Sequence, residues 1–199
     1  DYATPLYLRH KYDGTITNTI AHPLTCALYG KEVRQPIGGD FAFSGKLVEM
    51  WLSKKIPYDF GIDIFMTTTA LAEGFKVCQV YLGPKIHESK DPHGLIPMFV
   101  QVVSRLFELA RTYKVRWKSI DKIEKVPIFG QKSSQKPPKV QIDLKKLKKY
   151  DRISQDVWVK TVYDFLQSEK PVEKLAHFYL KAVASFIFDN WQPEDLVKE

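Results

Sequence analysis

Cysteine is scarce in this chain, which has two among its 199 residues, Cys26 and Cys78, and no Cys-x-x-Cys pair. Disulfide frameworks and structural zinc sites need more cysteines at closer spacing, so the sequence predicts neither. A protein without disulfides fits a reducing compartment, and we expect a cytoplasmic one.

Long apolar runs are lacking as well. No stretch approaches the roughly 20 apolar residues that a membrane-spanning helix needs, and no signal-like segment precedes the first charges. We therefore predict that a membrane is not a partner. The sequence starts on Asp1 instead of a methionine, which favours a fragment of a longer protein.

Positive charge is in excess, since 30 lysines and arginines stand against 23 acidic residues, a net charge of +7. This balance favours anionic partners such as nucleotides and phosphorylated metabolites. Much of the excess lies in the run Lys145, Lys146, Lys148 and Lys149. Because no aromatic side chains interleave with this run, we interpret it as a solvated face and predict no nucleic-acid partner.

Hydrophobic periodicity and helix breakers predict an α/β fold. Several segments have apolar residues at helical spacing, and Pro23 is expected to interrupt the first of them. The predicted helices are 14–29, 62–74, 96–114 and two tail segments starting at Ser154 and Val172, and the predicted strands are 41–43 and 75–82.

Three regions follow from this pattern. Residues 1–120 form the predicted body, 121–150 an exposed connector rich in proline, lysine, serine and glutamine, and 151–199 a helical C-terminal extension. The extension is expected to pack either on the body or on a second copy of the chain in a homo-oligomer.

Asp63 is the first candidate catalytic residue. It lies in the first turn of a predicted helix, where the helix dipole stabilises a carboxylate and keeps it ionised. Helix capping alone also explains an acid at this position. His87 follows in a polar loop between Lys85 and Lys90, a setting that suits a diphosphate beside a divalent cation. We expect Asp63 and His87 to face one cleft.

The corner Gly38-Gly39-Asp40 is the second candidate. A pair of glycines lets backbone approach a ligand closely. A plain tight turn explains the same residues, so both interpretations stay open at this point.

Five short segments carry a further signal: Gly14-Thr15-Ile16-Thr17, His22-Pro23-Leu24, Gln35-Pro36-Ile37-Gly38-Gly39-Asp40, Gly61-Ile62-Asp63 and Leu82-Gly83-Pro84-Lys85-Ile86-His87. In order and spacing they resemble the C-terminal half of retaining GT-A glycosyltransferases. The resemblance is to the group that makes glucosylglycerate, mannosylglycerate and glucosyl-3-phosphoglycerate, and it covers residues 5–115.

The resemblance implies the C-terminal half of a GT-A type nucleotide-sugar transferase fold with added C-terminal helices. It implies retaining transfer of a hexose, glucose or mannose, from a nucleotide diphosphate sugar to glycerate or a related small hydroxy acid. In the family, an Asp-x-Asp motif in the nucleotide-binding half holds Mg²⁺ or Mn²⁺, and the histidine that matches His87 completes the metal site. That half is not in this sequence, so we expect the isolated chain to be inactive.

The resemblance also implies roles for single residues. Asp63 matches the carboxylate beside the transferred sugar and the acceptor hydroxyl, and it is the predicted catalytic residue. The predicted donor-binding residues are Gly38, Gly39, Asp40 and Lys85, and the predicted acceptor-binding residues are Arg9, Asp13, Gly14, Thr15 and Thr17.

Two positions depart from the family pattern. Thr15 stands where members with a phosphorylated acceptor tend to have arginine, which favours an unphosphorylated acceptor. Asp40 replaces a glutamate, and the shorter side chain could shift sugar preference. Two rival functions are a non-catalytic anion- or nucleic-acid-binding module and a metal-dependent hydrolase that uses Asp63 and His87, for which further local ligands are lacking.

Overall fold

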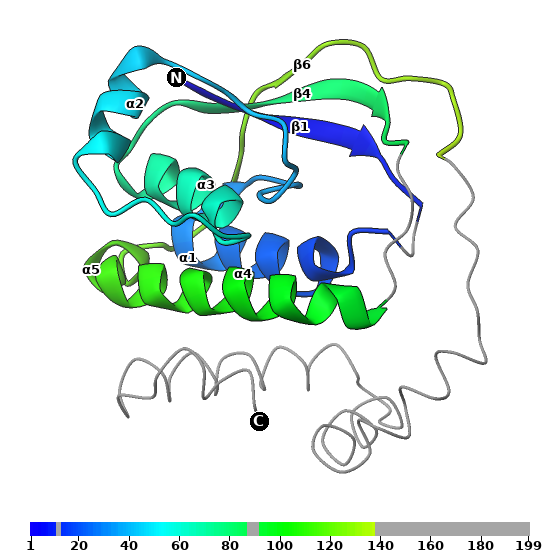
Figure 1. Cartoon of the computed structure of the whole chain (residues 1–199). Coiled ribbons are helices and arrows are strands. Elements are labelled where there is room, and N and C mark those ends of the chain that lie inside the picture. The colour runs from blue at the N-terminus through cyan, green and yellow to red at the C-terminus, as the bar shows by residue number, and fades with distance from the viewer. Residues whose placement is uncertain (11–12, 87–91, 138–199) are drawn as a thin grey trace. The chain divides into compact units, whose positions relative to one another are not determined.

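The computed structural model describes residues 1–10, 13–86 and 92–137 (Figure 1). The chain divides into two compact units, 1–140 and 141–199, and every described residue lies in the first. The predicted extension 151–199 and its helices lie outside the described residues.

The main sheet has four strands in the order β3-β1-β4-β6. At its centre β1 (Tyr2–Leu8) and β4 (Val77–Pro84) run parallel, with a register shift between Leu6 and Tyr7. The edge strand β6 (Ile128–Phe129) is parallel to β4, and the edge strand β3 (Ala42–Phe43) is antiparallel to β1. The α/β class is therefore confirmed, as a mixed sheet combined with helices.

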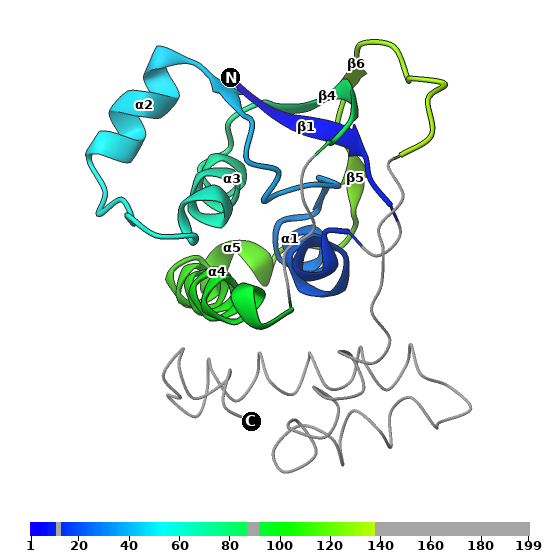
Figure 2. The same cartoon turned by 45° about the vertical axis from the view of Figure 1, so that its right-hand side comes forward.

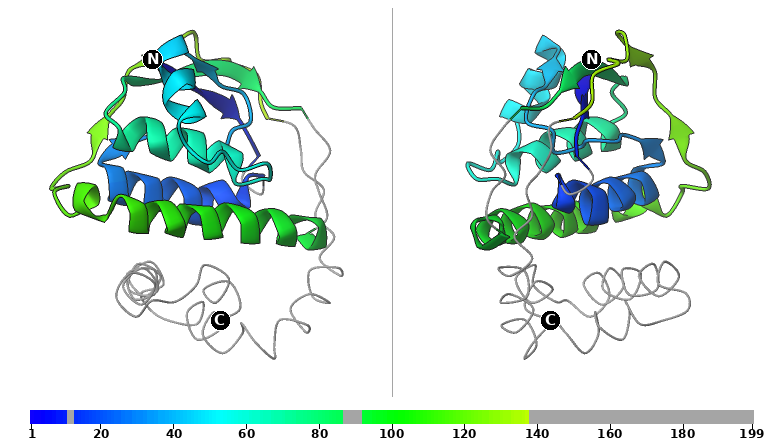
Figure 3. Two further views of the ribbon diagram at one scale, coloured as in Figure 1. Left: turned by 60° about the vertical axis from the view of Figure 1, so that its left-hand side comes forward. Right: turned by 90° about the vertical axis from the view of Figure 1, so that its right-hand side faces the viewer.

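Three helices lie on the same side of this sheet, α1 (His22–Tyr29), α3 (Ile62–Ala72) and α4 (Pro92–Thr112) (Figures 1 and 3). Helix α3 packs on β1 through buried side chains, where the Tyr2 hydroxyl bonds Thr67 Oγ1 at 3.0 Å. Trp51 of α2 (Gly45–Leu52) donates its indole N–H to Thr69 Oγ1 at 2.8 Å, which attaches α2 to α3. The core lies between the sheet and α3 and continues between α3 and the helices α1 and α4, which contribute buried residues such as Leu28 and Leu106.

The first predicted helix forms, with the interruption expected at Pro23. A π-helical segment, η1 (Thr17–Ala21), precedes α1, and the His22 amide donates to the Thr17 carbonyl five residues back. Because Pro23 has no N–H, it cannot continue the regular α-helical bonds at this point. Gly30, with φ of 66°, ends α1 as predicted.

Several short elements were not predicted. They are β1, α2, the four-residue α5 (Lys114–Trp117), and a separate two-stranded sheet of β2 (Lys31–Glu32) with β5 (Glu124–Lys125). Figure 2 labels β5. Strands β5 and β6 fall in the predicted connector; their residues are exposed, yet both pair with other strands. None of the described helices combines the length and apolarity needed to cross a bilayer.

Candidate functional site

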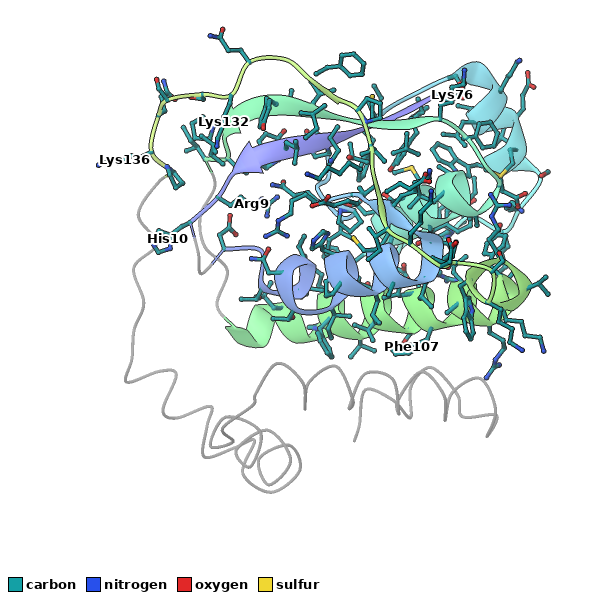
Figure 4. All side chains as sticks on the ribbon, turned by 180° about the vertical axis from the view of Figure 1, so that it is seen from behind. Arg9, His10, Lys76, Phe107, Lys132 and Lys136 are labelled. Carbon is teal, nitrogen blue, oxygen red and sulfur yellow. The ribbon has the colours of Figure 1, made fainter. Side chains whose placement is uncertain are left out.

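The candidate site lies where the parallel strands β1 and β4 end. Arg9 directly follows β1, Lys85 directly follows β4, and the Lys85 amide donates to the Leu8 carbonyl at 3.2 Å. Figure 4 shows Arg9 at the arrowhead of β1 and Lys76 toward the opposite edge of the sheet. Ligands of α/β proteins characteristically bind outside the carboxyl ends of parallel strands.

Asp40 is held at this edge by two donors. Its Oδ2 accepts hydrogen bonds from Lys85 Nζ at 2.5 Å and from the Tyr7 hydroxyl at 2.7 Å. These bonds, that from Lys85 first, hold the pKa of Asp40 below its ordinary value, so the carboxylate stays ionised. Lys85 Nζ also lies 4.3 Å from the centre of the Tyr7 ring, a cation–π distance.

Asp63 lies in the first turn of α3, as predicted. Burial raises the pKa of Asp63 to about 6, and the charge of Asp40 adds to this, whereas a hydrogen bond from the Gly39 amide and the charge of Lys85 oppose it. The expectation that the helix dipole keeps this group ionised therefore holds only above about pH 6, because burial is the larger effect. Neighbouring carboxyls with separated pKa values are typical of functional sites.

The predicted acceptor-binding residues lie on the segment after β1. Arg9 Nη1 is 3.8 Å from Asp13 Oδ2, and a Cβ at Gly14 would lie 3.4 Å from Arg9 Nη1 and 3.8 Å from Thr17 Cβ. Thr15 is exposed. Arg9 Nε is buried and has no hydrogen-bond partner among the described residues. Buried donors are nearly always bonded, so this one is an exception, as are six other buried side-chain atoms among the described residues.

The site carries charges of both signs. Arg9 and Lys85 are cationic, Asp13 and Asp40 are anionic, and Asp63 becomes anionic above about pH 6. The charge of Arg9 also lowers the pKa of Asp40, which couples the predicted acceptor and donor residues. Such a mixed set suits a ligand with several hydroxyls and one anionic group better than a polyanion. Lys85 is paired with Asp40, and its ammonium has three donors, so its predicted contact with a diphosphate would use a donor that Asp40 leaves free.

Gly38 and Gly39 differ in the space around their backbones. A Cβ at Gly38 would lie 2.2 Å from Pro5 Cγ, so this glycine is needed for packing against β1. Gly39 is exposed, has φ of 85°, and a Cβ there would meet nothing within 4 Å. Backbone open to a ligand is therefore found at Gly39, whereas Gly38 has a structural reason of its own.

The predicted metal ligand His87 lies outside the described residues, so its position relative to Asp63 is not part of this geometry. Across residues 1–10, 13–86 and 92–137 no group of three histidine, cysteine, aspartate or glutamate side chains could hold a metal ion. The described residues therefore do not fit a Mg²⁺ or Mn²⁺ site by themselves.

Sequence analysis missed Tyr7 and Gln35. Tyr7 bonds Asp40 and lies under Lys85, and Gln35 is buried and bonds the backbone of Tyr7. Gln35 belongs to one of the five segments of the resemblance, which was a signal that it lies near the site. Tyr7 gave none, because a tyrosine in a strand is usually a packing residue.

No family model matches the chain, and the search of curated proteins found no match. The resemblance to retaining GT-A transferases therefore rests on the five segments, and it stays a prediction.

Proposed function

We propose that this chain binds the transferred hexose and a small carboxylate-bearing acceptor in a retaining hexosyltransferase that uses a nucleotide diphosphate sugar. The observation that carries the proposal is the meeting of Arg9, Asp40, Asp63 and Lys85 at the carboxyl ends of β1 and β4. These residues come from four separate segments, and the predicted donor and acceptor groups are electrostatically coupled there.

Each charged group has a role in the proposed reaction. Arg9 binds the acceptor carboxylate through charge-assisted hydrogen bonds, and Asp40, which stays ionised, accepts hydrogen bonds from sugar hydroxyls. Asp63 orients the acceptor hydroxyl and stabilises the positive charge that develops at the anomeric carbon as its bond to the diphosphate breaks. Because only the ionised form of Asp63 does this, transfer rises with pH through about pH 6.

Binding of glycerate tests the role of Arg9 directly. Charge-assisted hydrogen bonds contribute about 1.5 to 3 kcal/mol, so Arg9→Met should weaken glycerate binding by about 10- to 100-fold in calorimetry. Arg116→Met is the matched control, because Arg116 is an exposed arginine of α5. It should leave glycerate binding unchanged.

The rivals give different results in the same experiment. Glycerate affinity that is equal in Arg9→Met and the parent protein contradicts the proposed acceptor site, and so does much tighter binding of 3-phosphoglycerate. Binding of RNA with no binding of either acid favours the non-catalytic module. Release of free hexose from the nucleotide sugar, with no acceptor product, favours the hydrolase.

A further inference from the structure

The segment from Gln35 to Asp40, here called the 35–40 loop, is fastened to β1 at both ends. At its start, Gln35 Oε1 accepts from the Tyr7 amide at 3.3 Å and Gln35 Nε2 donates to the Tyr7 carbonyl at 2.8 Å. At its end, the Tyr7 hydroxyl donates to Asp40 at 2.7 Å. Between these points Gly38 packs against Pro5. A single residue, Tyr7, therefore holds both ends of the loop.

The other side of the loop is fastened to α3. Thr67 Oγ1 donates to the Pro36 carbonyl at 2.7 Å, and the Gly39 backbone lies close enough to the Asp63 carboxyl group to lower its pKa. The loop is thus held between β1 and α3, and it presents Gly39 to Asp63 while Asp40 faces Lys85.

Gln35 acts at the register shift in β1. The shift falls between Leu6 and Tyr7, where the regular ladder with β4 changes. The amide of a glutamine carries one acceptor and two donors, so it can pair with a peptide unit as a neighbouring strand would. Gln35 is 7% exposed, and both ends of its amide are used by Tyr7. It therefore acts on the site through Tyr7.

We propose that Gln35 and Tyr7 are positioning residues: the Gln35 amide fixes Tyr7, and Tyr7 fixes the 35–40 loop so that Asp40 meets Lys85 and Gly39 meets Asp63. The effect on hexosyl transfer rests on the proposed function, whereas the effect on the loop does not. Groups held in place before the ligand arrives need no reorganisation during the reaction.

Nuclear magnetic resonance of the Gly39 amide tests the proposal without any ligand. Because this amide lies close to the Asp63 carboxyl group, its proton shift should titrate with a midpoint of about 6 in the parent protein. In Gln35→Met and in Tyr7→Phe the loop loses one of its attachments to β1. The pH-dependent shift of Gly39 should then fall by about half or more, because hydrogen bonds weaken steeply with distance and angle.

Gln79→Met serves as the matched control. It removes a buried glutamine whose amide accepts from the Arg34 amide and donates to the Glu32 carbonyl, and these two bonds do not involve Tyr7, Asp40 or Asp63. It should leave the Gly39 titration intact. An unchanged titration in Gln35→Met and Tyr7→Phe overturns the proposal, and an equal loss in Gln79→Met does too.

Glycerate binding separates this inference from the proposed function. Tyr7→Phe should leave the Kd for glycerate within about twofold of the parent value, since the substitution displaces Asp40 and leaves Arg9 in place. If the Gly39 titration is lost in the variants but the parent protein binds no glycerate, the positioning role stands and the proposed function fails.

Discussion

The two ends of helix α3 carry acidic side chains in opposite settings. Asp63, at the start of the helix, is largely buried, and its pKa is raised to about 6. Glu73, at the end, accepts hydrogen bonds from Lys54 and Tyr113, both at 2.7 Å, and these bonds hold its pKa below the ordinary value. The helix dipole alone would favour the opposite order, since it stabilises a carboxylate at the start and disfavours one at the end. Burial and local donors therefore outweigh the dipole at both ends.

The two carboxylates of α3 have different roles in the molecule. Glu73 connects three elements, because Lys54 follows α2 and Tyr113 follows α4. Asp63 forms no ion pair with a cation within the described part of the chain, and its ionisation carries a cost in stability. A carboxylate whose ionisation is unfavourable, such as Asp63, is typical of a functional site. A carboxylate that accepts hydrogen bonds from nearby donors, such as Glu73, stabilises the fold.

Among these substitutions, that of Gly38 should have the largest effect, because Gly38 packs the 35–40 loop, which neighbours Asp63, against β1. In Gly38→Ala the new Cβ would lie 2.2 Å from Pro5 Cγ, so the loop or β1 must move. Overpacking of this kind costs about 1 to 3 kcal/mol, and we expect a loss of about 2 kcal/mol in the free energy of unfolding by urea.

Gly45→Ala is the control for that substitution, because a Cβ at Gly45 would meet nothing within 4 Å. Its unfolding free energy should stay within about 0.5 kcal/mol of the parent value. Equal midpoints for Gly38→Ala and Gly45→Ala would show that the 35–40 loop can shift without cost.

Asp63→Asn should make the protein more stable at neutral pH. The pKa of Asp63 rises from 3.8 to about 6 on folding, so the folded state binds the proton more tightly and its stabilising contribution is lost as pH rises from about 4 to about 6. Above pH 6 the ionised, half-buried group costs up to about 3 kcal/mol, part of which asparagine avoids. Urea unfolding at pH 4.5 and pH 7.5 checks this: the gain in stability should appear mainly at the higher pH. A loss of stability at pH 7.5 would contradict it.

Glu73→Gln should have the smallest effect and the opposite sign. The folded pKa of Glu73 is depressed, so its contribution is present above the ordinary pKa of 4.5 and is lost as pH falls through the folded value. Ion pairs at a partly exposed position contribute up to about 1 kcal/mol, and we expect a loss of that size at pH 7 in the same unfolding assay. Glu124→Gln, which removes a more exposed pair with Lys31, should cost less. Greater stability in Glu73→Gln would remove the contrast between the two ends of α3.

Local signals predicted three of the described helices, α1, α3 and α4, and missed α2 and α5. The bounds of α3 follow from its apolar face and from Gly74, whose φ of 81° matches a helix stop, and the same holds for Gly30 after α1. These features depend on residues close together in sequence. Strand β1 was missed because Pro5 interrupts its pattern, and only pairing with the distant strand β4 defines it.

Hydrophobic periodicity predicted the positions of helices, but it could not predict which residues meet at the site. That Arg9 and Lys85 lie at one edge depends on the parallel pairing of β1 with β4, which no local pattern contains. The resemblance singled out both residues without this geometry. The raised pKa of Asp63 depends on burial by distant segments, so the sequence could place the residue but could not predict its titration.

The pairing of β1 with β4 also has a consequence for how the protein is made. Tyr2 pairs with Val77, so β1 leaves the ribosome long before its central partner exists. Until then β1 has unpaired backbone groups that can pair with other chains. The helices α1 and α3, built from local contacts, can form during this interval, whereas closing the strand pair must overcome the entropy of a long loop. Synthesis of β4 is therefore the step that gives β1 its partner and brings Arg9 and Lys85 into one site.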